Sequence, residues 1–361
     1  MSEAVRVGII GTSWWTDMMY LPSFASHPNA EIAAICGRNR ERAEDLAKIN
    51  CIGRVFTDYR KLISDAELDA VVIATPDDLH YAMTMDALDA GLHVLCEKPL
   101  ANNAGQAREM YEKAKSAGVK HMVLFTWRWQ PHWQYLKRLV DEGYVGRCYQ
   151  ARCAFDGGQG RVESNTWRAD STRSNGIVGD LGSHMIDFVR WYLGDVQSVV
   201  AHLPTLIDRS KLVGAPSQPA TDAALVSMEL KNGAQVLVQA SAVAHVGNQV
   251  VRIVVQLYGD EGSLEAEHIF LGRDAGVRLR GIRHDQDEFD SLEVPEDLSA
   301  GLDPGQLMDP YLKRSAGPRL FIDAILEDKP AAPDFYDALK VQEVVDAALK
   351  SHRDRGWVSL A

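Results

Sequence analysis

The sequence is poor in cysteine and has no long apolar run. Its five cysteines lack the paired spacing of zinc sites and thioredoxin-like motifs, and their odd number fits a reducing compartment. No His-Glu-x-x-His pattern occurs either, so we expect no metal site. No apolar stretch approaches the ~20 residues that span a bilayer. Since Met1-Ser-Glu-Ala-Val-Arg6 enters a strand without the basic and apolar parts of a signal peptide, we expect a cytoplasmic protein.

Basic residues are also in deficit, because 38 Lys and Arg face 50 Asp and Glu and give a formal net charge of -12. A phosphate backbone or an anionic membrane surface would be repelled on average, which argues against nucleic acid and membranes as partners. The composition, 46% hydrophobic and 24% charged, is typical of a globular protein. A length of 361 residues exceeds one ordinary core and predicts about two domains.

The arrangement of apolar segments changes near residue 125. Before it, short strands that are apolar throughout alternate with helical patterns, which predicts a parallel sheet covered on both faces. These strands lie at 5–10, 31–36, 70–74, 94–96 and 121–125. After it, longer strands follow one another with few helices between them, which predicts a mixed or antiparallel sheet. These are expected at 148–155, 223–230, 235–245 and 250–258, with helices at 176–193 and 334–349.

A lysine stands where one of the buried strands ends, in Glu97-Lys98-Pro99. Proline cannot donate to a strand ladder, so the strand stops there and Lys98 projects over the carboxyl edge of the sheet, where open α/β sheets hold ligands. We take Lys98 as the first catalytic candidate, the alternative being a surface lysine. Thr75 and Pro76 end another strand at the same edge. His80 follows in the next helix, where it could also be an ordinary helix-face histidine.

The turn after the first strand carries part of a dinucleotide-binding pattern. Gly11 fills the first position of G-x-G-x-x-G, whereas Ser13 and Thr16 stand at the second and third. Such glycines let backbone N–H groups at a helix N-terminus approach a pyrophosphate. The second strand ends in Cys36-Gly37-Arg38-Asn39-Arg40, with two guanidinium groups and no carboxylate, which favours NADP over NAD. Alternatively, the two arginines only solvate the start of a helix.

The segment Gly176-Ile-Val-Gly-Asp180-Leu-Gly-Ser-His184-Met-Ile-Asp187 combines polar and glycine positions at helical spacing. Residues at i, i+4 and i+7 share one face of a helix, so Asp180, His184 and Asp187 are predicted to form one stripe. Carboxylates on either side of the histidine favour imidazolium, and such a group can exchange a proton near neutral pH. A buried structural histidine in an ordinary helix start is the competing interpretation.

Together these segments resemble the Gfo/Idh/MocA dehydrogenases, the family of glucose-fructose oxidoreductase, inositol dehydrogenase and rhizopine catabolism proteins. The resemblance covers essentially the whole chain. It rests on the glycine turn, Ala74-Thr-Pro with His80, Glu97-Lys98-Pro99, Arg128-Trp129-Gln130-Pro131, Trp167-Arg168 and the segment 176–187. It implies an α/β protein with an N-terminal Rossmann domain, a doubly wound parallel sheet, at 1–125. The rest, 126–361, would be a substrate and oligomerisation domain with a large open, mostly antiparallel sheet, whose helix 334–350 could pack back on the first domain.

The resemblance also implies hydride transfer between a nicotinamide and a sugar or cyclic polyol, and the arginines after the second strand favour NADP, with NAD as the alternative. His184 would take the proton from a substrate hydroxyl, and Lys98 would polarise the oxygen of that hydroxyl. Asp180 would orient the substrate and His184. The predicted cofactor-binding residues are Gly8, Gly11, Thr12, Ser13, Trp14, Arg38, Ala74, Thr75, Pro76, His80, Glu97, Lys98 and Arg128. The predicted substrate-binding residues are Lys98, Arg128, Asp156, Trp167, Asp180 and His184.

Two other functions stay open at this stage. One is a glycoside hydrolase that uses bound NAD to oxidise and re-reduce a sugar transiently. The other is a regulatory protein that keeps the fold as a sugar or cofactor sensor, although the joint presence of Lys98, Asp180 and His184 argues against it. An open sheet with one uncovered face would expose apolar surface, so we also expect a homodimer or homotetramer.

Overall fold

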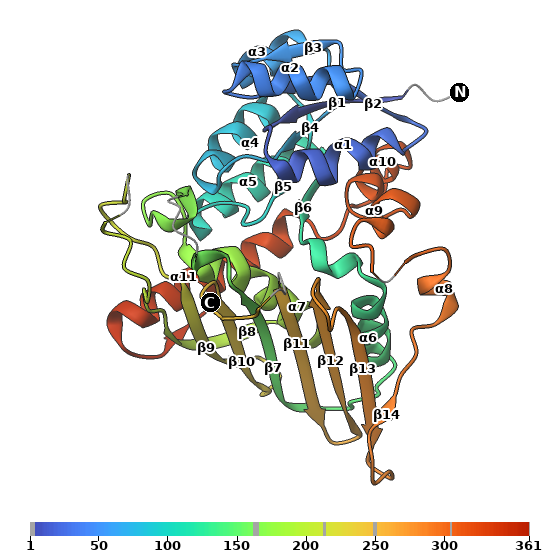
Figure 1. Cartoon of the computed structure of the whole chain (residues 1–361), viewed down its shortest axis with the longest axis vertical. Coiled ribbons are helices and arrows are strands. Elements are labelled where there is room, and N and C mark those ends of the chain that lie inside the picture. Colours follow the sequence, from blue (N-terminus) through green and yellow to red (C-terminus); the bar gives the residue numbers. More distant parts are fainter. Residues whose placement is uncertain (1–3, 162–165, 212–213, 248–250, 304, 361) are drawn as a thin grey trace. The chain divides into compact units, whose positions relative to one another are not determined.

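The computed structural model describes residues 4–161, 166–211, 214–247, 251–303 and 305–360 (Figure 1). The chain divides into two units, one of Met1–Trp129 with Gln306–Leu339, the other of Gln130–Gly305 with Lys340–Ala361. The predicted boundary at residue 125 lies close to the first crossing. The return of Gln306–Leu339 was not predicted, and the helix expected at 334–350 is divided between the units at residue 339.

The first unit is built on a parallel sheet of six strands in the order β3-β2-β1-β4-β5-β6 (Figure 1). The strands are β1 (Val5–Ile10), β2 (Ala30–Cys36), β3 (Arg54–Phe56), β4 (Ala70–Ile73), β5 (His93–Glu97) and β6 (His121–Leu124). The intervening helices are α1 (Leu21–Ala25), α2 (Arg40–Ile49), α3 (Tyr59–Asp65), α4 (His80–Asp89) and α5 (Ala104–Ala117). β4 is buried along its whole length, as expected of a strand covered on both faces. The order confirms the predicted doubly wound sheet. Successive strands are added outward from β1 on one side and outward from β4 on the other, so the strand order reverses between β1 and β4.

The returning segment supplies part of the core of this unit. Its helices α9 (Asp309–Lys313) and α10 (Pro318–Leu326) pack on α1. Fully buried Tyr311 and Phe321 join the same apolar cluster as Tyr20 and Phe24. These aromatic side chains bury apolar area that the first 129 residues would otherwise expose, which is a driving force for the return.

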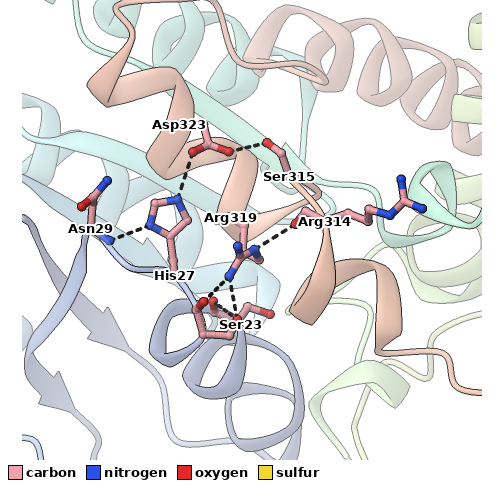
Figure 2. A network of polar contacts seen from close by, with 8 residues as sticks. Ser23, His27, Asn29, Arg314, Ser315, Arg319 and Asp323 are labelled. Atoms are coloured by element: carbon pink, nitrogen blue, oxygen red, sulfur yellow. Dashed lines mark hydrogen bonds and ion pairs between the residues drawn. The ribbon is translucent and has the colours of Figure 1, made fainter. Parts of the chain in front are cut away.

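A polar network fastens α10 to the end of α1 (Figure 2). His27 Nε2 lies 3.0 Å from Asp323 Oδ1, and Ser315 donates to the other oxygen of Asp323. Because His27 Nδ1 accepts from the backbone N–H of Asn29 at 3.2 Å, the ring proton is on Nε2 and is donated to the carboxylate. Arg319 donates to the backbone oxygen of Ser26. The network therefore fixes α10 beside the helix that follows the first turn of the sheet.

The second unit contains a sheet of nine strands in the order β14-β13-β12-β11-β7-β10-β9-β8-β15 (Figure 1). They are β7 (Cys148–Gly157), β8 (Val196–His202), β9 (Ala223–Leu230), β10 (Gln235–Ser241), β11 (Val251–Gly259), β12 (Gly262–Phe270), β13 (Gly276–Arg283), β14 (Asp290–Ser291) and β15 (Val358–Ser359). Only β7 and β10 pair in parallel among these strands, which confirms a mostly antiparallel sheet. The predicted strand at 250–258 is β11, although Val250 lies outside the described residues. The predicted strand at 235–245 is shorter and ends at Ser241.

The two faces of this sheet differ. α7 (Ser183–Leu193) packs on β7 and β10, while α6 (Pro131–Asp141) packs on α7. The longest helix of the chain, α11 (Phe335–Asp354), bonds to the chain after β8 through His352. The opposite face carries alternate side chains that include the exposed Leu225 and Leu237. In the described residues, no helix has both the length and the apolar character needed to cross a membrane.

Candidate active site

The turn after β1 lies between the ends of β2 and β4, at the point where the strand order reverses. Gly11 has φ +125°, and a Cβ there would stand 2.2 Å from the backbone oxygen of Ala74, so only glycine fits this position. Its N–H donates to the backbone oxygen of Cys36 at 2.8 Å. Open α/β sheets bind ligands at this place, and the turn has the close backbone approach of a phosphate-binding turn.

The two departures from the glycine pattern have local explanations. Ser13 Oγ lies 3.3 Å from both the backbone N and the hydroxyl of Thr16, so it caps the turn that follows. That turn is π-helical, η1 (Thr16–Tyr20), and Thr16 is fully buried in it. Trp14, in contrast, is 65% exposed. Ser13 thus stabilises the helix start where a glycine was expected.

Two other predicted cofactor residues differ in their surroundings. Gly8 lies inside β1, where a Cβ would meet the side chains of Leu62 and Leu68; the structure therefore gives it a packing role and not a place in the turn. Arg38 is exposed just after β2, and among the described residues it has no hydrogen-bond or ion-pair partner. Its neighbour Arg40 pairs with Glu44 at 3.2 Å. Arg38 is thus available to a ligand.

His80 joins the ends of β4 and β5 from within α4. The ring is fully buried, with Nε2 2.9 Å from the backbone oxygen of Thr75 and Nδ1 2.8 Å from that of Pro99. Burial lowers the pKa of His80, and the two carbonyl contacts offset part of that effect. Both ring nitrogens are therefore engaged by the protein, so His80 supports the loops that carry Thr75 and Lys98.

Glu97, the last residue of β5, holds the backbone of Lys98. Its Oε1 accepts from Trp15 Nε1 at 2.6 Å and from the Tyr20 hydroxyl at 2.7 Å. Its Oε2 accepts from the backbone N–H of Lys98 at 3.2 Å. The sequence did not predict either long-range bond, because Trp15 and Tyr20 fit an apolar helix start equally well.

The segment with Asp180 begins at a glycine that the fold requires. Gly176 has φ +59°, and a Cβ there would stand 2.5 Å from Thr221 Oγ1 and 2.8 Å from the Thr221 backbone. Asp180 follows in a second π-helical turn, η6 (Val178–Gly182), and His184 lies in the first turn of α7. The predicted α-helical spacing from Asp180 to Asp187 is therefore interrupted at its start. His184 and Asp187 are buried, whereas the side chain of Asp180 is 18% exposed.

Arg168 is the partner of Asp180. Its Nε lies 3.4 Å from Asp180 Oδ2, and its guanidinium stands 4.3 Å from the centre of the Trp167 ring. Arg168 lies in the short helix η5 (Trp167–Ala169). The sequence pattern included Trp167-Arg168 but gave Arg168 no role, since nothing local connects it with a residue twelve positions later. The ion pair and the stacked ring together orient the Asp180 carboxylate.

Asp156 is not brought to the same side of the sheet as His184. Phe155 faces α7, and its ring centre lies 6.0 Å from that of His184. Side chains alternate along a strand, so Asp156 points to the opposite face. There it accepts from Gln239 at 2.9 Å and lies 3.7 Å from Arg252. The predicted hydrogen bond from a substrate hydroxyl to Asp156 is therefore not supported by this placement.

Two further predicted residues, Arg128 and Trp167, belong to different units. Arg128 is buried in the short helix η3 (Thr126–Trp129) of the first unit. Lys98 belongs to the same unit, whereas Asp180, His184 and Trp167 belong to the second. No group of three His, Cys, Asp or Glu side chains suited to a metal ion occurs among the residues that the structure describes.

The doubly wound sheet and its glycine turn define a dinucleotide-binding oxidoreductase fold. Comparison with known families gives the same class: the oxidoreductase family with an NAD-binding Rossmann fold matches residues 5–125. The GFO/IDH/MocA C-terminal domain matches residues 133–265. The chain belongs to the Gfo/Idh/MocA family of oxidoreductases.

Several relatives are similar over most of their length. The levoglucosan dehydrogenase of Pseudarthrobacter phenanthrenivorans is 28% identical over 357 residues, covering 90% of this chain and 88% of that protein. The D-glucoside 3-dehydrogenase of Escherichia coli is 28% identical over 312 residues, covering 81% and 87%. A solved structure of levoglucosan dehydrogenase with NADH and levoglucosan has a TM-score of 0.88 at 27% identity, covering 99% of this chain and 100% of that one.

Proposed function

We propose that this protein is an NADP-dependent dehydrogenase or reductase that acts on a CH–OH group of a sugar or cyclic polyol. The observation that carries the proposal is the glycine turn at the reversal of strand order, with Lys98 at the end of a nearby strand. The relatives support the substrate class, since levoglucosan and D-glucosides are sugars. We expect the protein to act in the cytoplasm, as its sequence suggested.

The residues at the turn fit a dinucleotide. Gly11 leaves the backbone open where a Cβ would meet Ala74, and a helix begins directly after the turn, which suits a pyrophosphate. Ser13 and Trp14 would lie beside it. Arg38, exposed at the end of β2, would bind the 2′-phosphate that distinguishes NADP from NAD. Because no carboxylate stands at that strand end, NADP is favoured although solved relatives contain NADH.

When bound, the oxidised nicotinamide would accept a hydride from the substrate carbon. His184 would take the proton of the hydroxyl on that carbon, and Lys98 would stabilise the negative charge that develops on its oxygen. Asp180, which pairs with Arg168 at 3.4 Å, would hold the substrate and His184 in the relative position that proton transfer needs. In the reverse direction His184 returns the proton to the oxygen. Arg128 and Trp167 would contact the substrate.

Calorimetric titration of nucleotide-free protein with NADPH and NADH tests the cofactor assignment. We expect NADPH to bind more tightly, and Arg38→Ala to weaken NADPH by about tenfold or more while leaving NADH nearly unchanged, because one charge-assisted phosphate contact is lost. Arg40→Ala, which removes the neighbouring arginine already paired with Glu44, is the matched control. Tighter binding of NADH would refute the role of Arg38, and binding of neither would refute the redox function.

The proton-transfer role is tested with a turned-over substrate. His184→Ala should lower kcat by about 100-fold or more, since general acid–base catalysis contributes that much. Binding of NADPH should stay unchanged. An unaltered kcat would remove His184 from the mechanism.

We also propose a homodimer or homotetramer that associates through the uncovered face of the second sheet. That face exposes Leu225 and Leu237 on β9 and β10, and it carries paired charges of both signs on β11, β12 and β13. Across a two-fold interface between two copies of such a face, apolar side chains can contact apolar side chains and positive charges can lie against negative ones.

A further inference from the structure

The Glu97 carboxyl group connects two segments that the proposed reaction must use together. One segment is the helix start after the phosphate turn, which contributes Trp15 and Tyr20. The other is Lys98, whose backbone N–H donates to Glu97 Oε2. Glu97 and Tyr20 are buried, and Trp15 Nε1 and Tyr20 Oη both donate to the same oxygen, at 2.6 and 2.7 Å. A short chain of hydrogen bonds therefore links the segment after the phosphate turn, through the Glu97 carboxyl group, to the backbone of Lys98.

We propose that Glu97 is a positioning residue that couples occupation of the phosphate turn to the placement of Lys98. A nucleotide that orders the turn would fix Trp15 and Tyr20, these would fix the Glu97 carboxyl, and the carboxyl would fix Lys98. The inference rests on the proposed function, because it assumes that the turn receives a dinucleotide.

Three features support coupling over a purely structural bond. Tyr20 belongs to the π-helical turn η1 and Trp15 borders it, and such turns occur often at functional sites. Trp14, next in the chain to Trp15, is exposed, so a ligand that contacts Trp14 acts directly on this segment. The rings of Trp14 and Trp15 meet edge to face with centres 5.3 Å apart.

The contacts give Glu97 a second role beside the predicted cofactor contact. The sequence suggested a direct cofactor contact, but both carboxyl oxygens already accept hydrogen bonds from the protein. Oε1 already accepts two hydrogen bonds, so a direct cofactor contact would have to use the remaining acceptor capacity of Oε2, beside the N–H of Lys98. Lys98 is fixed from its other side as well, because His80 contacts the backbone oxygen of Pro99 at 2.8 Å.

The test measures the reactivity of Lys98 and does not depend on turnover. Full-length protein is labelled with an amine reagent, and the initial rate at Lys98 is followed by peptide mass spectrometry. The probe is 2′-phospho-ADP-ribose, which carries the phosphates of NADP but no nicotinamide that could cover the lysine. We expect the probe to change the Lys98 labelling rate by about fivefold or more, the lower end of ordinary allosteric coupling.

Two variants separate coupling from the electrostatic effect of the bound phosphates. Tyr20→Phe removes one donor to Glu97 at nearly constant volume, and Glu97→Gln removes the charge. Both variants should still bind the probe. The ratio of the Lys98 labelling rates with and without the probe should fall towards one. Tyr59→Phe is the matched control, because it removes a tyrosine hydroxyl that donates to Asp86 at 2.7 Å in the same unit; its ratio should equal that of the unmodified protein.

The outcomes distinguish this inference from the proposed function. An undiminished ratio in Tyr20→Phe and Glu97→Gln overturns the coupling, as does a bound probe that leaves Lys98 unchanged in the unmodified protein. If the probe does not bind the unmodified protein at all, the proposed function fails and the inference with it. If Glu97→Gln does not fold, which circular dichroism would show, Tyr20→Phe decides alone.

Discussion

At the scale of single residues, the second unit buries two histidines against each other. His132 is the second residue of α6, and His268 lies on the face of β12 that packs inward. Their ring centres are 4.7 Å apart and the rings are perpendicular. Burial lowers the pKa of His268 to about 4 and that of His132 well below its usual value. Both rings are therefore neutral at physiological pH.

This pair makes the stability of the protein sensitive to acid. The unfolded chain takes up a proton on His268 near pH 6.5, whereas the folded chain does so only near pH 4, so stability falls as the pH drops between these values. The loss is about 3 kcal/mol for this group alone, at about 1.4 kcal/mol per pKa unit. Thermal unfolding at pH 7.5 and pH 4.5 should show a smaller difference in Tm for His268→Phe than for the unmodified protein.

The exposed His284, which lies 3.4 Å from Glu261, offers a control for this measurement. His284→Gln should leave the difference in Tm between the two pH values unchanged. An equal difference in the unmodified protein and His268→Phe would contradict the assignment of acid sensitivity to His268.

Residue identities could be predicted from the sequence, but their partners could not. Lys98 was predicted as a catalytic residue because proline ends its strand, and His184 because of its spacing from Asp180 and Asp187. The bonds from Trp15 and Tyr20 to Glu97 span 82 and 77 residues. No local pattern encodes such a contact, and it becomes visible only once the sheet places β1 and β5 on either side of β4.

At the scale of elements, the two segments with the richest chemistry both begin with a π-helical turn. These are η1 after the phosphate turn and η6 at Asp180. A search for apolar residues at a period of 3.6 finds α-helices and passes over such turns. In contrast, β12 has alternating inward and outward residues along Gly262–Phe270, a signal that was present in the sequence and would have predicted a half-buried strand.

A substitution at Gly176 tests how far η6 depends on its glycine. Gly176→Ala places a Cβ 2.5 Å from Thr221 Oγ1 at φ +59°. The free energy of unfolding should therefore fall by more than the roughly 1–2 kcal/mol that left-handed backbone strain alone costs. The substitution should also lower kcat by about tenfold or more, because displacement of Asp180 disturbs the reacting geometry. Unfolding in urea and steady-state kinetics measure the two effects.

Gly214→Ala provides the comparison, since Gly214 has φ +71° and no atom within 4 Å of a Cβ. It should show the strain without a change in kcat. Equal losses of stability in the two variants would show that the approach to Thr221 is unimportant.

At the scale of the whole molecule, the uncovered face of the second sheet is a network of paired charges with an apolar part. Glu267 bonds Arg252 at 2.7 Å and Arg278 at 3.2 Å, and Glu265 bonds Arg280. Leu225 and Leu237 are 48% and 39% exposed on neighbouring strands. Paired charges cost little to bury compared with isolated ones, so such a face is suited to a partner.

Leu237→Glu should therefore disrupt the proposed homo-oligomer. A carboxylate placed in the apolar part of the face would face its own copy across a two-fold interface, and the added repulsion and desolvation weaken association. Sedimentation velocity at micromolar concentration should show a lower mass than for the unmodified protein. Leu206→Glu, at an exposed leucine outside the strands, should keep the mass unchanged. A monomeric unmodified protein would refute the proposal.

The return of Gln306–Leu339 to the first unit also has a consequence for biosynthesis. When the first 129 residues leave the ribosome, Tyr20 and Phe24 lack the cover of α9 and α10. The N–H of Val123 in β6 still lacks its acceptor, the backbone oxygen of Pro333, 3.0 Å away in the finished fold. An unpaired edge and bare aromatic side chains are features of aggregation-prone intermediates. The unit that emerges first therefore stays incomplete until Gln306–Leu339 has been translated, after β7 to β14 of the second sheet. Until then, the nascent chain must keep it from premature association.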